Sequence, residues 1–321
     1  MHHAWDRDNC IKHALAVLFL TGMVFASERT RQPAILFPEI LALLTGMWVT
    51  PRMPWRVSRW EIPVLMTCSA VWGVLLCRYL PAPTAVKMGA AFLGAAGALL
   101  LTHTTLLPIL SACILPILIG EQSWVYPLAV AVMTMLLSGV QALLEKASLR
   151  APQHAERWNW RAREELLRWG LLIPAVTLLA AAAIELDLPC VVAPPLIVLL
   201  SELSFPESPA AEKGKTIALV TILCACAGAG ARYALVMAAG LPLWLAALAA
   251  CVGVFLVFRA LHTPFPPAGA LAILPMLLPG ARIPSYPLQV AAGTLLFLLL
   301  ARLTRHVLKK ASRRKSIAYY N

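Results

Sequence analysis

Two stretches of the chain decide the fold. His103–Pro127 reads HTTLLPILSACILPILIGEQSWVYP, and His262–Pro287 follows the same plan as HTPFPPAGALAILPMLLPGARIPSYP. Both begin with His-Thr, continue as an apolar run interrupted by proline, and end in Tyr-Pro. Proline removes a backbone donor from a helix, and a broken helix at membrane depth must be enclosed by protein or water. The pattern therefore predicts two related units, each containing a broken helix.

Further pairs recur in the same order outside these stretches. Cys77-Arg78-Tyr79 matches Ala231-Arg232-Tyr233, and Pro38–Thr45 runs parallel to Pro194–Ser201. Recurrence of several motifs in one order indicates a tandem duplication.

The composition predicts a membrane protein. Of the 321 residues, 60% are hydrophobic and 13% are charged, whereas soluble domains are roughly 45–50% apolar and about 25% charged. The excess apolar surface has to face lipid, which excludes a soluble enzyme, a secreted disulfide scaffold and a disordered chain. The eight cysteines show no CxxC or Cys/His ligand spacing, so we expect no metal site and no cofactor.

The apolar runs predict an all-α, polytopic protein of about 12 segments, given that a span needs roughly 17–25 residues. We expect a first six-segment repeat at 1–144, a basic amphipathic linker at 145–168, a second repeat at 169–304 and a basic tail at 305–321. The short, proline-broken segments at 105–119 and 264–279 either span or re-enter. The predicted segments are 11–27, 33–49, 61–80, 85–102, 105–119, 124–144, 169–186, 189–203, 216–239, 242–261, 264–279 and 286–304.

Charge predicts the orientation. The net charge is +12, with 27 Lys and Arg against 15 Asp and Glu. Six crossings per unit make the repeats parallel, with a pseudo-twofold axis along the membrane normal. With a cytoplasmic N-terminus, most basic residues fall in cytoplasmic loops, so we expect both termini inside a bacterial inner membrane. The basic residues then meet membrane lipid and not nucleic acid. The linker forms either a helix at the headgroup level or a solvated connection.

The sequence contains no GxSxG, HExxH or P-loop pattern, so we expect no enzyme. The recurring Arg78-Tyr79 and Arg232-Tyr233 predict a cationic substrate-binding vestibule, because guanidinium groups bind carboxylates and oxyanions. The alternative is a pair of interfacial arginines. His103 and His262 are either proton-sensitive groups at the inner mouth or structural residues at helix ends.

Prolines and two carboxylates complete the candidate site. Pro108, Pro266 and Pro267 break the fifth segments and predict either the constriction of a path or simple kinks. Glu39 and Glu202 pair with an arginine or bind a coupling proton, although their positions do not correspond across the repeat.

The second half resembles the HPP family of integral membrane proteins. Pro266-Pro267-Ala268-Gly269-Ala270 matches that family's His-Pro-Pro-Ala-Gly-Ala signature, with His262 four positions before Pro266, and the loop Phe205–Ala211 is similar to its Ser-Pro-Leu-Ala loop. This resemblance covers residues 190–300. The layout of two six-helix units also resembles aromatic acid exporters, fusaric acid resistance proteins and aluminium-activated malate channels.

These resemblances imply movement of a small anion: nitrite for some HPP proteins, and aromatic or carboxylic acids for the exporters, which can work with a periplasmic adaptor. We expect a transporter or channel-like protein with an anion path between the halves. The alternatives are a non-transporting scaffold or subunit of an efflux assembly and, as a third class, a membrane-embedded enzyme.

Overall fold

The structure is a computed structural model that describes residues 7–152, 157–205 and 208–318, all of whose regular elements are helical. Within these residues, eight helices are long and apolar enough to cross a membrane. This confirms the predicted all-α class and supports the predicted multi-pass membrane protein. The long helices are α1 (Arg7–Thr30), α3 (Glu61–Tyr79), α4 (Thr84–Thr102), α6 (Val125–Lys146), α7 (Ala162–Glu185), α10 (Gly214–Ala231), α11 (Leu243–Ala260) and α13 (Tyr286–Ala318).

The other four predicted segments contain short helices. They are α2 (Glu39–Leu44), which continues as a π-helical turn η2 (Thr45–Val49), α5 (Pro108–Ile119), α8 (Pro194–Leu203) and α12 (Pro266–Ile273). Proline stands at the first position of α5, α8 and α12, and directly before α2. A proline at the first turn suits a helix start and prevents a longer helix from running through it. Segments 33–49 and 189–203 therefore contain short helices as well, although only the segments at 105–119 and 264–279 were predicted to be short.

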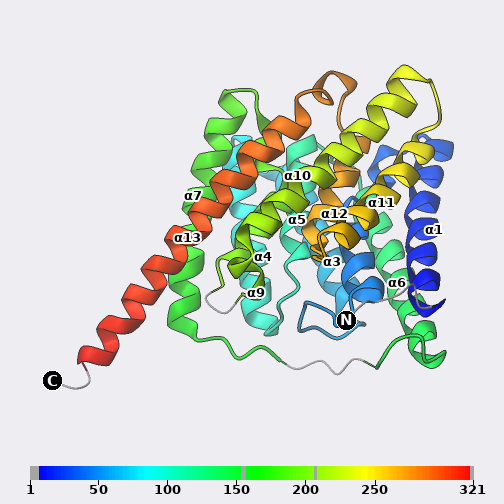
Figure 1. Cartoon of the computed structure of the whole chain (residues 1–321). Helices are drawn as coiled ribbons and strands as arrows, with labels where there is room; N and C mark the ends of the chain where they lie inside the picture. The colour runs from blue at the N-terminus through cyan, green and yellow to red at the C-terminus, as the bar shows by residue number, and fades with distance from the viewer. Residues whose placement is uncertain (1–6, 153–156, 206–207, 319–321) are drawn as a thin grey trace.

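The short helices form the interior of the bundle. Almost every residue of these helices is buried, and α5 and α12 lie between the longer helices in Figure 1. Across the two halves, α2 packs on α12 and α5 packs on α8, while α8 also contacts α12 and α2 contacts α5. A helix that is apolar on all sides is stable only when enclosed, so the long helices shield these short ones from lipid.

Close backbone approach fixes the short helices against their neighbours. A Cβ atom at Gly73 in α3 would overlap the carbonyl of Cys113 in α5, and one at Gly228 in α10 would overlap the carbonyl of Ala272 in α12. Small residues at helix interfaces permit such contacts in membranes. The two glycines therefore allow α3 and α10 to pack directly against the backbones of α5 and α12.

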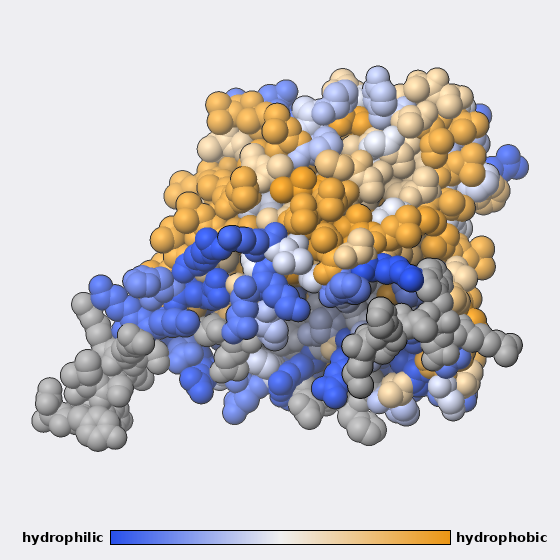
Figure 2. Space-filling model, in the orientation of Figure 1, coloured by the Kyte–Doolittle hydropathy of each residue, from blue (hydrophilic) through white to orange (hydrophobic). Residues whose placement is uncertain are grey.

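The polar segments gather at one end of the bundle. Figure 2 shows a broad hydrophobic band with hydrophilic residues along the lower face, where Figure 1 places the linker and the end of α13. In the linker, α6 ends at Lys146, α7 begins at Ala162 and residues 157–161 are non-helical. The expected tail continues α13 as far as Ala318. Residues 153–156 of the linker, 206–207 of the loop that resembles the HPP family, and the tail's last three residues, 319–321, lie outside the described residues.

Candidate functional site

A cavity of about 860 Å³ lies at the polar face, between the linker, the end of α8, the start of α9 (Pro209–Glu212) and α13. We call this cavity the vestibule. Aromatic side chains form much of its wall: Trp55, Trp158, Trp160 and Phe205. The Trp160 and Phe205 rings stack with centroids 6.2 Å apart, and the Arg56 guanidinium lies 4.5 Å from the Trp158 ring centroid. The vestibule thus has an aromatic wall with a cationic group packed against it.

The linker is held in place by the C-terminal end of α4. Trp158 donates its backbone N–H to the His103 carbonyl at 2.9 Å, and Trp160 Nε1 donates to the Leu99 carbonyl at 3.3 Å. Arg157 donates to the Thr102 carbonyl at 2.7 Å and pairs with Glu61. The last carbonyls of a helix have no helical partner and favour donors and cations. Residues 157–161 of the linker are therefore non-helical and form a wall of the vestibule.

Two buried arginines bind the ends of α2 and α8. Arg150 donates to the Thr50 carbonyl at 2.8 Å and to the Gly46 carbonyl at 3.3 Å, just where η2 ends. Burial lowers the pKa of Arg150 to about 10, against the opposing charge of Glu145, so the side chain stays charged at neutral pH. Arg168 donates to the Ser201 carbonyl and to Ser204 Oγ, each at 3.1 Å, at the end of α8. Both arginines donate to carbonyls at the C-terminal ends of these helices, where cationic side chains are favoured.

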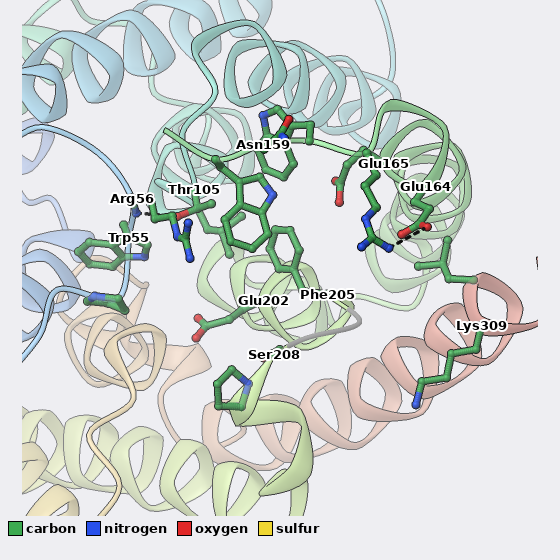
Figure 3. A pocket seen from close by; sticks show the side chains of 17 residues that line it. Trp55, Arg56, Thr105, Asn159, Glu164, Glu165, Glu202, Phe205, Ser208 and Lys309 are labelled. Atoms are coloured by element: carbon green, nitrogen blue, oxygen red, sulfur yellow. Dashed lines mark hydrogen bonds and ion pairs between the residues drawn. The ribbon is translucent and has the colours of Figure 1, made fainter. Parts of the chain in front are cut away.

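Charged side chains of both signs line the vestibule. Arg161 pairs with Glu164 at 3.5 Å, and Glu165 pairs with Arg168 at 2.6 Å. Figure 3 shows the side chains of Arg56 and Glu202 projecting into the cavity, with Lys309 on α13 at its far side. The vestibule can therefore hold a polar or charged solute beside its aromatic wall.

A second, much smaller cavity of about 10 Å³ lies where the four short helices meet. Each helix contributes two residues of its first turn, three positions apart: Glu39 and Ala42, Pro108 and Ser111, Pro195 and Val198, and Pro267 and Ala270. Trp55 completes the lining and also lines the vestibule. We call this the central cavity. Its volume is about that of one water-sized probe, and Trp55 is the lining residue that it shares with the vestibule.

Glu39 is the charged residue of the central cavity. Its side chain is 1% exposed, and the Ser111 hydroxyl donates to Oε1. Oε2 is buried without a hydrogen-bond partner among the described residues. An unpartnered buried carboxylate oxygen is costly, so Glu39 is a candidate functional residue.

The structure gives the two predicted arginine–tyrosine pairs different surroundings. Arg78 and Tyr79 end α3 and are exposed, with the guanidinium 5.5 Å from the Tyr79 ring centroid. Arg232 is half-buried and donates to the Pro275 carbonyl in the broken fifth segment, while Tyr233 is exposed. Neither pair lines the vestibule or the central cavity.

The predicted histidines and prolines fall in separate places. His103 and His262 are exposed and follow α4 and α11 in the left-handed region, with φ of 52° and 48°. His103 Nδ1 also lies 3.2 Å from the Trp158 carbonyl oxygen. These contacts fit helix-ending residues. Pro108, Pro266 and Pro267 lie in the first turns of α5 and α12, and Pro108 and Pro267 meet at the central cavity.

Sequence reasoning named Glu39 in α2 and Glu202 in α8, but it missed Trp55, the aromatic wall of the vestibule and the meeting of α2 and α8 with α5 and α12 at one cavity. One usable signal was present: Pro38 and Pro194-Pro195 start short helices just as Pro108 and Pro266-Pro267 do. Trp55 carries no such signal, because its position depends on the folding of the loop before α3.

Comparisons with protein-family models, with curated proteins and with solved structures gave no match to this chain. Among the described residues, no group of three or more His, Cys, Asp or Glu side chains is placed to hold a metal ion.

Proposed function

We propose that this protein moves a small anion across the membrane, along a path from the vestibule through the central cavity. The observation that carries the proposal is the meeting of the first turns of the four short helices beneath an 860 Å³ chamber. Interrupted helices at membrane depth line cavities because their backbone groups need partners there.

The sign of the solute follows from helix direction. A helix carries partial positive charge at its N-terminus, equivalent to roughly half an elementary charge. α5, α8 and α12 all begin at the central cavity, so three positive helix ends face one small volume. Prolines in these first turns remove some backbone donors but leave the field of the rest of each helix. This field favours an anion and opposes a cation.

Contacts at matching positions support two parallel repeats related by an axis along the membrane normal. Tyr126 Oη donates to the Ala112 carbonyl at 2.9 Å, and Tyr286 Oη donates to the Leu271 carbonyl at 2.6 Å. α1 packs on α11, and correspondingly α7 packs on α4. In this arrangement the path follows the axis, and Arg78 and Arg232 attract anions at the outer face, opposite the vestibule.

Orientation, location and partners complete the proposal. The basic linker and the basic end of α13 lie on one face, which supports both termini in the cytoplasm of a bacterial inner membrane and contact with anionic lipid. The family resemblance favours nitrite or an organic acid as the solute, and a periplasmic adaptor as a possible partner class.

A specific observation favours one other function. The central cavity has room for about one water-sized probe, at about 10 Å³, so the short helices pack almost without a gap. Close packing between halves is also what a non-transporting scaffold requires, and its partner surface would be the polar face.

Anion flux decides between these functions. Purified protein in liposomes is tested with nitrite, nitrate, chloride and benzoate under a potassium diffusion potential, with protein-free liposomes as the control. Transport predicts flux above the control for at least one of these anions. Control-level flux for every anion, from protein that remains monodisperse and folded, refutes transport and favours the scaffold.

A further inference from the structure

The carboxylate of Glu39 lies where an anion on the proposed path has to bind. Glu39 lines the central cavity together with the first turns of α5, α8 and α12, whose positive ends attract negative charge. The cavity holds about one water-sized probe beside this side chain. An ionised Glu39 thus supplies the negative charge that these helix ends favour, and it leaves no room for a second anion.

No cation neutralises Glu39 among the described contacts. Ser111 is its hydrogen-bond donor, Oε2 is unpartnered, and none of the ion pairs found among the described residues involves it. A buried carboxylate without a cation is stabilised by dipoles, or it binds a proton. Both states are therefore accessible to Glu39.

Among the groups packed around Glu39, the Glu39 carboxylate is the one that gains or loses a proton most readily. α12 and η2 contain no titratable residue, and the buried side chains of α1 are apolar or a serine hydroxyl. α5 brings the Cys113 thiol, which donates to the Ala91 carbonyl at 3.4 Å, and α6 brings Tyr126, whose hydroxyl donates to Ala112. Free Cys and Tyr ionise well above Glu, and burial raises the cost of their ionisation further.

We propose that Glu39 is a proton-operated gate: its ionised carboxylate occupies the anion site, and a small inorganic anion binds there once Glu39 is protonated. This rests on the proposed anion path. In the closed state Glu39 is the tethered anion. When Oε2 accepts a proton, the side chain becomes neutral, the positive helix ends no longer hold it, and a free anion displaces it from the cavity. Release of the anion and loss of the proton restore the closed state.

Binding and flux together test the gate, with nitrate as the probe. In detergent, nitrate should raise the melting temperature of the wild-type protein more at pH 5 than at pH 8, because a ligand stabilises the state that it binds. Glu39→Gln keeps the size of the side chain and an oxygen that accepts the Ser111 hydrogen bond, but it cannot ionise. Nitrate should therefore stabilise this variant equally at both pH values. Glu185→Gln, at the exposed end of α7, should behave as the wild type.

In liposomes, wild-type nitrate flux should increase as pH falls, by at most about tenfold per pH unit, the limit for one linked proton. Glu39→Gln should give flux that does not vary with pH. Wild-type flux with the same pH dependence in Glu39→Gln overturns the gate and leaves the path intact. Control-level flux in both proteins refutes transport. The melting temperatures then test whether Glu39 controls nitrate binding. If nitrate stabilisation has the same pH dependence in Glu39→Gln and the wild type, or no pH dependence in either, the gate is overturned.

Discussion

Replacement of Arg168 tests how the end of α8 is held. Arg168 is fully buried and donates to Glu165 Oε2 at 2.6 and 2.9 Å, to the Ser201 carbonyl and to Ser204 Oγ. Arg168→Met keeps an apolar side chain against Phe205 but leaves the Glu165 carboxylate buried and unpaired. Breaking one partner of a buried ion pair costs about 3–5 kcal/mol.

The matched control lies in the same helix region. Arg161 also pairs with a glutamate three residues later, Glu164, but its side chain is 74% exposed. An exposed pair contributes about 0–1 kcal/mol. At roughly 2–4 °C per kcal/mol for chains of a few hundred residues, Arg168→Met should lower the melting temperature by on the order of 6–20 °C, and Arg161→Met by no more than about 4 °C.

The assay is thermal unfolding in detergent, followed by circular dichroism at one scan rate, because membrane proteins often unfold irreversibly. The double variant Arg168→Met/Glu165→Met removes both charges and should recover much of the loss, since it leaves no unpaired buried carboxylate. Equal melting temperatures for Arg168→Met and Arg161→Met would refute the reasoning, as would a double variant less stable than Arg168→Met alone.

Three further predictions concern packing and the path. Gly228→Ala should destabilise by about 1–3 kcal/mol because its Cβ overlaps the Ala272 carbonyl, whereas Gly230→Ala, with nothing within 4 Å, should melt as the wild type; equal losses in both would contradict the close approach. Arg78→Ala combined with Arg232→Ala should reduce anion flux in liposomes without loss of expression, and unchanged flux would remove both arginines from the mechanism. Trp55→Leu should increase flux because Trp55 lines both the vestibule and the central cavity and the smaller side chain leaves more room between them, and flux no higher than wild type would place the barrier elsewhere.

The candidate site was predictable only where its signal is local. Proline at the start of α5 and α12 is visible in the sequence, and both helices do begin at the central cavity. Glu39 stood out as a charge in an apolar segment, but its lack of an equivalent across the halves made it a weaker candidate than the arginines. The structure gives Glu39 its importance through the helices that surround it, which no local pattern reports.

The linker shows the same limit from the other side. Trp158 and Trp160 among arginines are typical of a helix at the headgroup level, yet both side chains form the wall of the vestibule. An amphipathic aromatic residue favours an interface between apolar and polar surroundings, and both a lipid surface and the wall of a cavity provide one. Here carbonyl groups at the end of α4 accept hydrogen bonds from both residues, and these contacts place the two side chains.

The sequence alone indicated a membrane protein, its helical class and the positions of the long helices, because hydropathy and length are properties of contiguous residues. The tertiary structure alone decided that Glu39, Pro108, Pro195 and Pro267 share one cavity and that Arg78 and Arg232 do not line it. Contacts between residues far apart in the chain depend on how the helices pack, and packing is set by the shapes of many side chains at once.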